Sequence, residues 1–100
     1  MYHITSLARW TSAQSEGWID ADSLHSEGFI HMCYEHQLEG VLQRHFAGKT
    51  DLIKLTLDEE SLKESTKLEY SAGLKDSFPH CYGTIPLTSI KSVEPIKSSS

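Results

Sequence analysis

The chain has 100 residues and a mass of 11.3 kDa, which is the size of a single compact domain. Hydrophobic residues make up 38% of it, a share typical of folded domains rather than disordered chains. Nine basic and fourteen acidic side chains give a net charge of −5, which disfavours binding to bulk DNA or RNA. We expect one domain over residues 1–97 and a frayed tail over residues 98–100.

Membrane insertion and secretion are not indicated by the sequence. No apolar run approaches the roughly 20 residues that cross a bilayer. The first residues lack the basic patch and apolar segment of a signal peptide. We therefore expect a cytoplasmic protein without membrane contacts. Because nothing indicates an oxidising compartment, Cys33 and Cys81 are predicted to be free thiols.

The N-terminal third begins with a strand and a helix. Alternation of apolar and polar side chains over residues 2–5 predicts the strand. Apolar residues at helical spacing predict a helix over residues 7–16, with Ser6 as its N-cap and Gly17 at its end. Residues 18–27 follow neither period and are rich in Asp and Ser, so they are predicted to form a loop.

The middle of the chain repeats this order of strand and helix. Residues 28–33 alternate and predict a second strand. An apolar stripe over residues 35–46 predicts a helix that packs on a sheet and ends before Gly48. Gly40 lies inside this helix, where glycine is unfavourable, and we expect a closely packed neighbour there.

The remaining elements are mainly strands. The clearest strand covers residues 52–57, and Ile53, Leu55 and Leu57 are predicted to face inward. Residues 59–64 predict one helical turn. A strand over residues 67–71 follows, with Leu68 and Tyr70 predicted to be buried. Residues 71–76 are predicted to form a flexible connector, and residues 78–83 a constrained segment. The last predicted strand covers residues 90–96 and is interrupted by Pro95. Together these elements predict an α+β domain with a small, split, mostly antiparallel sheet and two flanking helices.

Three histidines lie inside otherwise apolar or turn-forming segments and are the first candidates for chemistry: His3, His31 and His80. If the first two strands adjoin, His3 and His31 project toward one cleft. A neutral imidazole there can form hydrogen bonds with a hydroxyl or a phosphate. The alternative is that each imidazole only satisfies a buried backbone group.

A zinc site is a second candidate, because nitrogen and sulfur side chains cluster in one stretch of the chain: His25, His31, Cys33 and His36. Their spacing matches no recurrent ligand pattern, and we expect no metal. A nucleophilic cysteine needs a lowered pKa and a nearby base. Cys81 follows His80 directly, and neighbouring residues of a strand point to opposite faces, so a buried inert thiol is predicted. Trp10 is predicted to be a core residue.

Several short segments occur in the order and spacing of one known family. They are Tyr2-His3-Ile4-Thr5, Trp10, Ser23-Leu24, Glu27-Gly28-Phe29-Ile30-His31, Gln37, the stretch over residues 46–52, and Phe78-Pro79-His80-Cys81-Tyr82-Gly83. Over residues 2–96 the chain resembles the family called domain of unknown function 952, whose members have no settled activity.

That family is similar to a small version of the ADP-ribosyltransferase fold, and in particular to the catalytic half of RNA 2′-phosphotransferases. Those enzymes use NAD, so the resemblance implies NAD as the cofactor. It implies that His3 binds the ribose of the nicotinamide half and that Thr5 and His31 match family positions. The chain departs from the pattern because Arg9 and Arg44 are its only arginines, so the phosphate-binding arginine set is not evident.

A late glutamate steadies the oxocarbenium ion in many transferases of this fold, and Glu69 is its positional match here. Cys33 stands where family members often carry Ser. The combined hypothesis is a cleft that binds NAD or another ribose-phosphate ligand and transfers ADP-ribose or a related group. The residues predicted for it are His3, His31 and His80 as catalytic residues, and His3, Thr5, Ser23, Gly28 and Tyr82 as cofactor-binding residues.

Two alternatives belong to other functional classes. The first is a non-catalytic nucleotide or small-molecule binding module that kept the cleft but lost the groups needed for transfer. The acidic balance and the scarcity of arginine favour it. The second is a structural interaction protein, in which the histidines are packed and paired with backbone groups.

Overall fold

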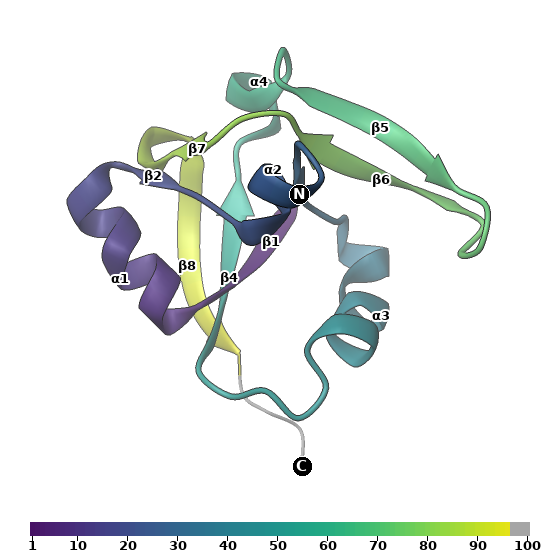
Figure 1. Ribbon diagram of the computed structural model, residues 1–100, viewed down its shortest axis with the longest axis horizontal. Helices are drawn as coiled ribbons and strands as arrows, with labels where there is room; N and C mark the ends of the chain where they lie inside the picture. The colour runs from purple at the N-terminus through teal and green to yellow at the C-terminus, as the bar shows by residue number, and fades with distance from the viewer. Residues whose placement is uncertain (97–100) are drawn as a thin grey trace.

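The computed structural model describes residues 1–96 and contains four α-helices and eight strands within that range (Figure 1). The helices are α1 (Leu7–Glu16), α2 (Asp22–Ser26), α3 (Glu35–His45) and α4 (Glu59–Leu62), with a 3₁₀ turn at Leu87–Ser89. The strands are β1 (Tyr2–Ser6), β2 (Trp18–Ile19), β3 (Ile30–His31), β4 (Leu52–Leu57), β5 (Thr66–Ser71), β6 (Asp76–Cys81), β7 (Ile85–Pro86) and β8 (Ile90–Ile96). The predicted α+β class is therefore confirmed.

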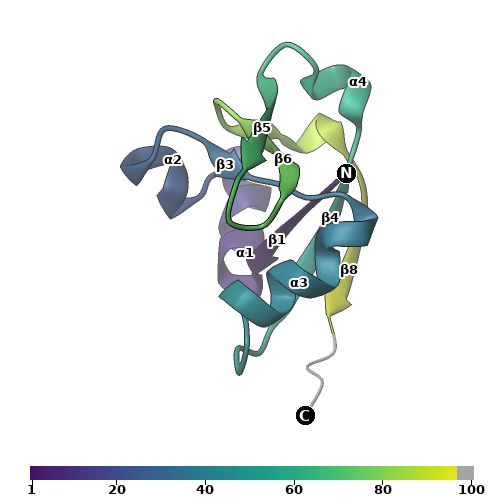
Figure 2. The ribbon, with the colours of Figure 1, turned by 90° about the vertical axis from the view of Figure 1, so that its right-hand side faces the viewer.

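The strands form three small antiparallel sheets. Their orders are β1-β4-β8, β2-β7 and β3-β6-β5. The first and third sheets meet where Tyr2 and Cys33 exchange two backbone hydrogen bonds, of 2.7 and 2.8 Å. In both ribbon views, α1 lies on one side of the β1-β4-β8 sheet and α3 on the other, close to the β5–β6 hairpin (Figures 1 and 2). None of the helices in residues 1–96 is long and apolar enough to cross a membrane.

The hydrophobic core is built around β4, the central strand of the first sheet. Ile53, Leu55 and Leu57 are buried, as the alternating pattern predicts. They pack with buried side chains from the rest of the chain, among them Ala13, Ile19, Ile30, Met32, Leu62 and Ile85. Trp10 packs against this cluster from α1, which confirms its prediction as a core residue.

The ends of α1 follow the predicted capping pattern. The Ser6 hydroxyl accepts a hydrogen bond of 3.1 Å from the backbone N–H of Arg9, which satisfies a free donor of the first turn. Gly17 ends the helix with φ of 94°, a left-handed conformation that favours glycine. The predicted bounds of this helix, residues 7–16, are confirmed.

Two predictions about local structure are wrong. Residues 18–27 are not a loop, because they contain β2 and α2. These elements have two and five residues, too few to show a hydrophobic period. The predicted strand over residues 28–33 shrinks to Ile30–His31, with Cys33 in the isolated bridge to Tyr2.

The burial predicted for β5 is also wrong. Leu68 and Tyr70 are 60% and 67% exposed, although they alternate as in a half-buried strand. Figure 1 shows the reason: the β5–β6 hairpin extends beyond the body of the protein, and β5 lies on its outer side. The predicted connector over residues 71–76 is the turn of this hairpin. Residues 97–100, which include the predicted frayed tail, lie outside the described residues.

Candidate functional site

A cavity of about 670 Å³ lies among β1, the start of α2, α3 and the β5–β6 hairpin. Its volume is within the range of small-molecule binding sites. The lining includes five of the residues predicted from the sequence: His3, Thr5, Ser23, His31 and His80. The structure thus brings these distant segments to one cavity, while the functional roles of the five residues stay predictions.

His3 is held in a defined state by burial. Its side chain is only 6% exposed, and its Nδ1 lies 2.8 Å from the carbonyl oxygen of His31. Burial lowers the pKa of His3 from 6.5 to about 4, so the imidazole is neutral near pH 7. Since a carbonyl only accepts, Nδ1 carries the proton and donates it, which leaves Nε2 as an acceptor.

His31 and His80 lie directly opposite each other on β3 and β6. Their ring centroids are 5.2 Å apart and their planes are nearly perpendicular, at 82°. Each ring is bound to a carboxylate: Nε2 of His31 lies 2.9 Å from Glu27, and Nδ1 of His80 lies 2.9 Å from Glu69. A carboxylate on one ring nitrogen fixes the orientation of an imidazole, which is the arrangement found in acid–base catalysis.

Aromatic contacts and a tyrosine complete the surroundings of His80. The Phe29 ring stacks on the His80 ring, with centroids 4.0 Å apart and planes inclined by 15°. Glu69 accepts hydrogen bonds from both His80 and the hydroxyl of Tyr82. The bond from Tyr82 and then that from His80 lower the pKa of Glu69, and the same carboxylate raises the pKa of Tyr82. Glu69 therefore stays ionised and holds His80 in place.

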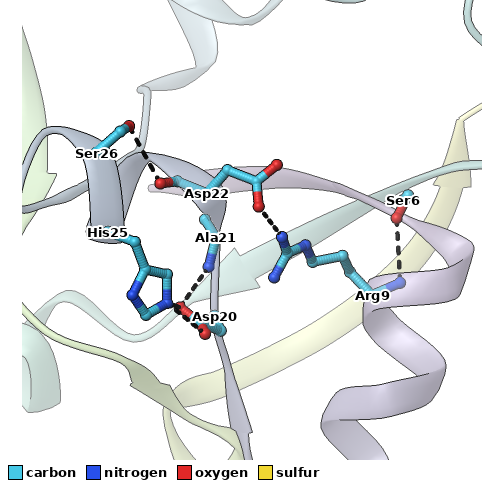
Figure 3. Close-up of polar contacts among 7 residues, drawn as sticks. All are labelled: Ser6, Arg9, Asp20, Ala21, Asp22, His25 and Ser26. Carbon is cyan, nitrogen blue, oxygen red and sulfur yellow. Dashed lines mark hydrogen bonds and ion pairs between the residues drawn. The ribbon is translucent and has the colours of Figure 1, made fainter.

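Both arginines of the chain line the cavity, which the sequence did not indicate. Arg9 forms an ion pair with Asp22 at the start of α2 (Figure 3). The guanidinium of Arg44 lies 5.9 Å from the centroid of the Phe78 ring. They stand 35 positions apart on two helices, so only the tertiary arrangement shows that they share a site.

Two predicted cofactor-binding residues do not line the cavity: Gly28 and Tyr82. Gly28 ends the loop after α2 with φ of 92°, so its conformation explains the glycine without a ligand. Tyr82 is 41% exposed and is connected to His80 indirectly, through Glu69 and through the Phe29 ring. Glu69 likewise lies behind His80, outside the cavity lining.

The histidines considered as zinc ligands point to separate carboxylates. His25 binds Asp20 at 2.8 and 3.0 Å (Figure 3), and His36 binds Asp76 at 2.9 Å. Within residues 1–96, no group of three or more His, Cys, Asp or Glu side chains is arranged to hold a metal ion. The four residues of the zinc hypothesis therefore form no common site in this part of the chain.

Both cysteines are free and buried, as predicted. Burial raises the pKa of Cys33 from 9.0 to about 11, which opposes formation of the nucleophilic thiolate. Cys81 is fully buried, and its sulfur lies 3.4 Å from the carbonyl oxygen of Gly83. Neither environment is that of an activated nucleophile.

Gln37 is a positioning residue that the sequence reasoning did not single out for the site. It is 5% exposed, and its Nε2 donates to the carboxylate of Asp76 at 2.9 Å and to the carbonyl of Ser77 at 2.7 Å. Its Oε1 accepts from the backbone N–H of Tyr34 at 2.9 Å. One buried amide thus joins the start of α3 to the β5–β6 hairpin, two elements that also contribute residues to the cavity.

Comparison with known proteins identifies the family. The model of the family described as "Protein of unknown function (DUF952)" matches residues 4–93. The chain belongs to this family. A search among proteins with curated descriptions found no match.

Solved structures of one protein of Caulobacter crescentus, CC0527, share the fold. Its crystal structure has a TM-score of 0.89 and 28% sequence identity, and the match covers 96% of this chain and 84% of that one. A crystal structure of its double mutant gives 0.89 and 27% over the same shares. Its solution NMR structure gives 0.81 and 28%, over 95% of this chain and 82% of that one. The resemblance to the DUF952 family is confirmed by the family match over residues 4–93, while the likeness to ADP-ribosyltransferases stays a prediction.

Proposed function

We propose that the cavity binds a small organic anion that carries hydroxyl groups beside phosphate, with NAD or another ribose phosphate as the ligand class. The observation that carries this proposal is the state of His3. Its single proton is committed to the His31 carbonyl, so Nε2 offers a lone pair to a ligand donor such as a ribose hydroxyl.

The two arginines supply the complementary half of this recognition. Arg9 and Arg44 line the same cavity as His3, and guanidinium groups bind phosphate through paired hydrogen bonds. Because Arg9 is already paired with Asp22, Arg44 is the main cation for the ligand phosphate. A neutral acceptor beside this cation matches a ligand with hydroxyl donors and an anionic group. Phe46 and Phe78, which also line the cavity, provide apolar surface for a base or a sugar ring.

Binding is tested by titration calorimetry with NAD and with ADP-ribose. We expect saturable binding to the unaltered protein, and at least about tenfold weaker binding to Arg44→Ala, since a charge-assisted hydrogen bond contributes about 1.5–3 kcal/mol. His3→Ala tests the acceptor in the same way. His25→Ala is the matched control, because His25 is paired with Asp20 and does not line the cavity. Equal binding, or none, by all four proteins would refute the proposal.

Transfer of ADP-ribose or a related group is the second candidate function. The two carboxylate-bound imidazoles favour it, because His31 and His80 are oriented side by side on the cavity wall. The position of Glu69 favours a binding module without catalysis instead. Glu69 does not line the cavity, and its carboxylate already accepts hydrogen bonds from His80 and Tyr82. Release of nicotinamide from NAD, measured by chromatography, separates the two. Turnover that is lost in His80→Ala supports transfer, and binding without turnover supports the module.

A further inference from the structure

The outer edge of β5 is an unpaired strand edge with a defined hydrogen-bonding pattern. Within residues 1–96, β5 pairs only with β6 and lies at the end of its sheet (Figure 1). Pro79 lies opposite Leu68, and its carbonyl accepts from Met32 at 3.0 Å on the β3 side. The backbone of Pro79 therefore faces β3, which makes Leu68 and Pro79 a non-hydrogen-bonded pair. The N–H and C=O of Leu68 point to the open edge.

The same alternation fixes the neighbours of Leu68. In an antiparallel pair, hydrogen-bonded and non-hydrogen-bonded positions alternate, so the backbone groups of Thr66 and Tyr70 also point outward. The hydrogen bond of 2.7 Å from the Tyr82 N–H to the Ser65 carbonyl confirms this alternation. It shows that the backbone of Ser65 points toward the β6 side, so the backbone of Thr66, the next residue, points away from it. The backbone N–H and C=O groups of Thr66, Leu68 and Tyr70 thus point to the open edge of β5.

The side chains of this edge complement a second copy of themselves. If two β5 strands pair antiparallel with Leu68 opposite Leu68, Lys67 of each strand lies opposite Glu69 of the other. Thr66 then lies opposite Tyr70, and the outward backbone groups of residues 66, 68 and 70 bond to one another. A shift of one residue in the pairing would lose both the charge pairs and the backbone match.

We propose that two copies of this chain associate through β5, in this register, to form a continuous six-stranded sheet with the order β3-β6-β5-β5-β6-β3. The apolar side chains at the centre of the contact, Leu68 and Tyr70, are 60% and 67% exposed in the single chain. Long exposed edges of this kind are sites of strand addition. The occupant is a second copy because the charges on the two sides of Leu68 are opposite in sign, so that pairing with an identical strand places each Lys67 against a Glu69.

Charge exchange tests the register. Lys67→Glu places carboxylates opposite one another in the symmetric pair, and Glu69→Lys places ammonium groups opposite one another. We expect sedimentation equilibrium to show self-association in the unaltered protein, and association about tenfold weaker or more in each variant. An equimolar mixture of the two variants has only opposite charges across the contact, so it should form a heterodimer. Two variants that remain monomeric on mixing would overturn the proposal.

A backbone test locates the contact independently of charge. Leu68→Pro removes the N–H that points to the open edge and none that pairs with β6, so the hairpin should persist while the dimer is lost. Amide hydrogen exchange followed by NMR gives a second reading. Exchange at Leu68 and Tyr70 should slow as the protein concentration rises. A protein that stays monomeric at millimolar concentration, or a dimer whose Leu68 amide exchanges unchanged, would refute pairing through β5.

Discussion

The Nδ1 atom of His3 lies 2.8 Å from the carbonyl oxygen of His31, a hydrogen bond between residues 28 positions apart. It links the first strand to the third and fixes the tautomer of the imidazole, with the proton on Nδ1. Because the folded chain excludes water from His3, protonation of this ring opposes folding. That relationship makes stability depend on pH.

The first prediction concerns acid stability. The pKa of His3 falls from 6.5 to about 4 on folding. Between these two pH values, His3 is protonated in the unfolded chain and neutral in the folded chain. The stability that His3 provides is complete above pH 6.5 and declines as the pH falls toward 4. With about 1.4 kcal/mol per pKa unit, the loss amounts to about 3 kcal/mol.

Urea denaturation between pH 7.5 and 4 measures this effect. Carboxylates with lowered pKa values, such as Asp20, Glu69 and Asp76, weaken the fold in the same direction at lower pH. His3→Gln removes only the His3 contribution, so the difference between the two proteins isolates it. Parallel stability curves for the two proteins between pH 6.5 and 4 would contradict the prediction.

The second prediction concerns the phenol of Tyr82. Its hydrogen bond to Glu69 raises its pKa, because ionising the phenol places a second negative charge beside the carboxylate. Glu69→Gln removes that charge, and the pKa of Tyr82 should fall toward 10. Ultraviolet titration of phenolate, with Tyr82→Phe to assign the signal, checks the shift. An unchanged titration would mean that the hydrogen bond is absent in solution.

The third prediction concerns Gln37, the buried amide between α3 and the hairpin. Gln37→Ala leaves the Ser77 carbonyl and the Tyr34 N–H without this partner, and should cost about 2–3 kcal/mol of unfolding free energy. Thermal or urea denaturation measures the loss. Gln43→Ala is a control on the same helix, because the hydrogen bond of Gln43 to Glu39, of 3.4 Å, is exposed to solvent. Equal effects of the two substitutions would show that the buried amide does not stabilise the contact between α3 and the hairpin.

The fourth prediction separates stability from ligand binding at Gly40. A Cβ added there would lie 2.7 Å from Nη1 of Arg44, the far end of a flexible side chain, so the arginine must move. Gly40→Ala should stabilise α3 by roughly 1 kcal/mol through helix propensity while weakening binding of the anionic ligand at Arg44. Glu39→Ala is the neighbouring control. Improved stability with unchanged NAD or ADP-ribose binding would show that the position of Arg44 is unimportant for the ligand.

The sequence predicted those elements whose pattern is long enough to read. The cap at Ser6, the left-handed Gly17 and the alternation over residues 52–57 each reflect a local physical preference, and the structure confirms all three. β2 and β3 have two residues each, and tertiary packing rather than local pattern determines them. The exposure of Leu68 was missed because alternation shows which residues share a face, not whether another layer covers it.

The candidate site was predictable only in part for a similar reason. His3, His31 and His80 stood out because each is a polar residue in an apolar or constrained segment, and they line one cavity. Arg9 and Arg44 lie on helix surfaces, where an arginine is ordinary, so no local feature distinguished them. Their shared position results from how α1 and α3 flank the central sheet.

The walls of the cavity come from β1, α2, α3 and the β5–β6 hairpin, segments that adjoin only once the chain has folded. A compound that occupies the cavity therefore binds the folded chain and not the denatured chain. Its binding free energy increases the free energy of unfolding. At a concentration one hundred times the dissociation constant this amounts to about 2.7 kcal/mol, enough to raise the melting temperature by roughly 10–20 °C. A melting-temperature screen of metabolite collections can consequently identify natural occupants of this protein without any assay of catalysis.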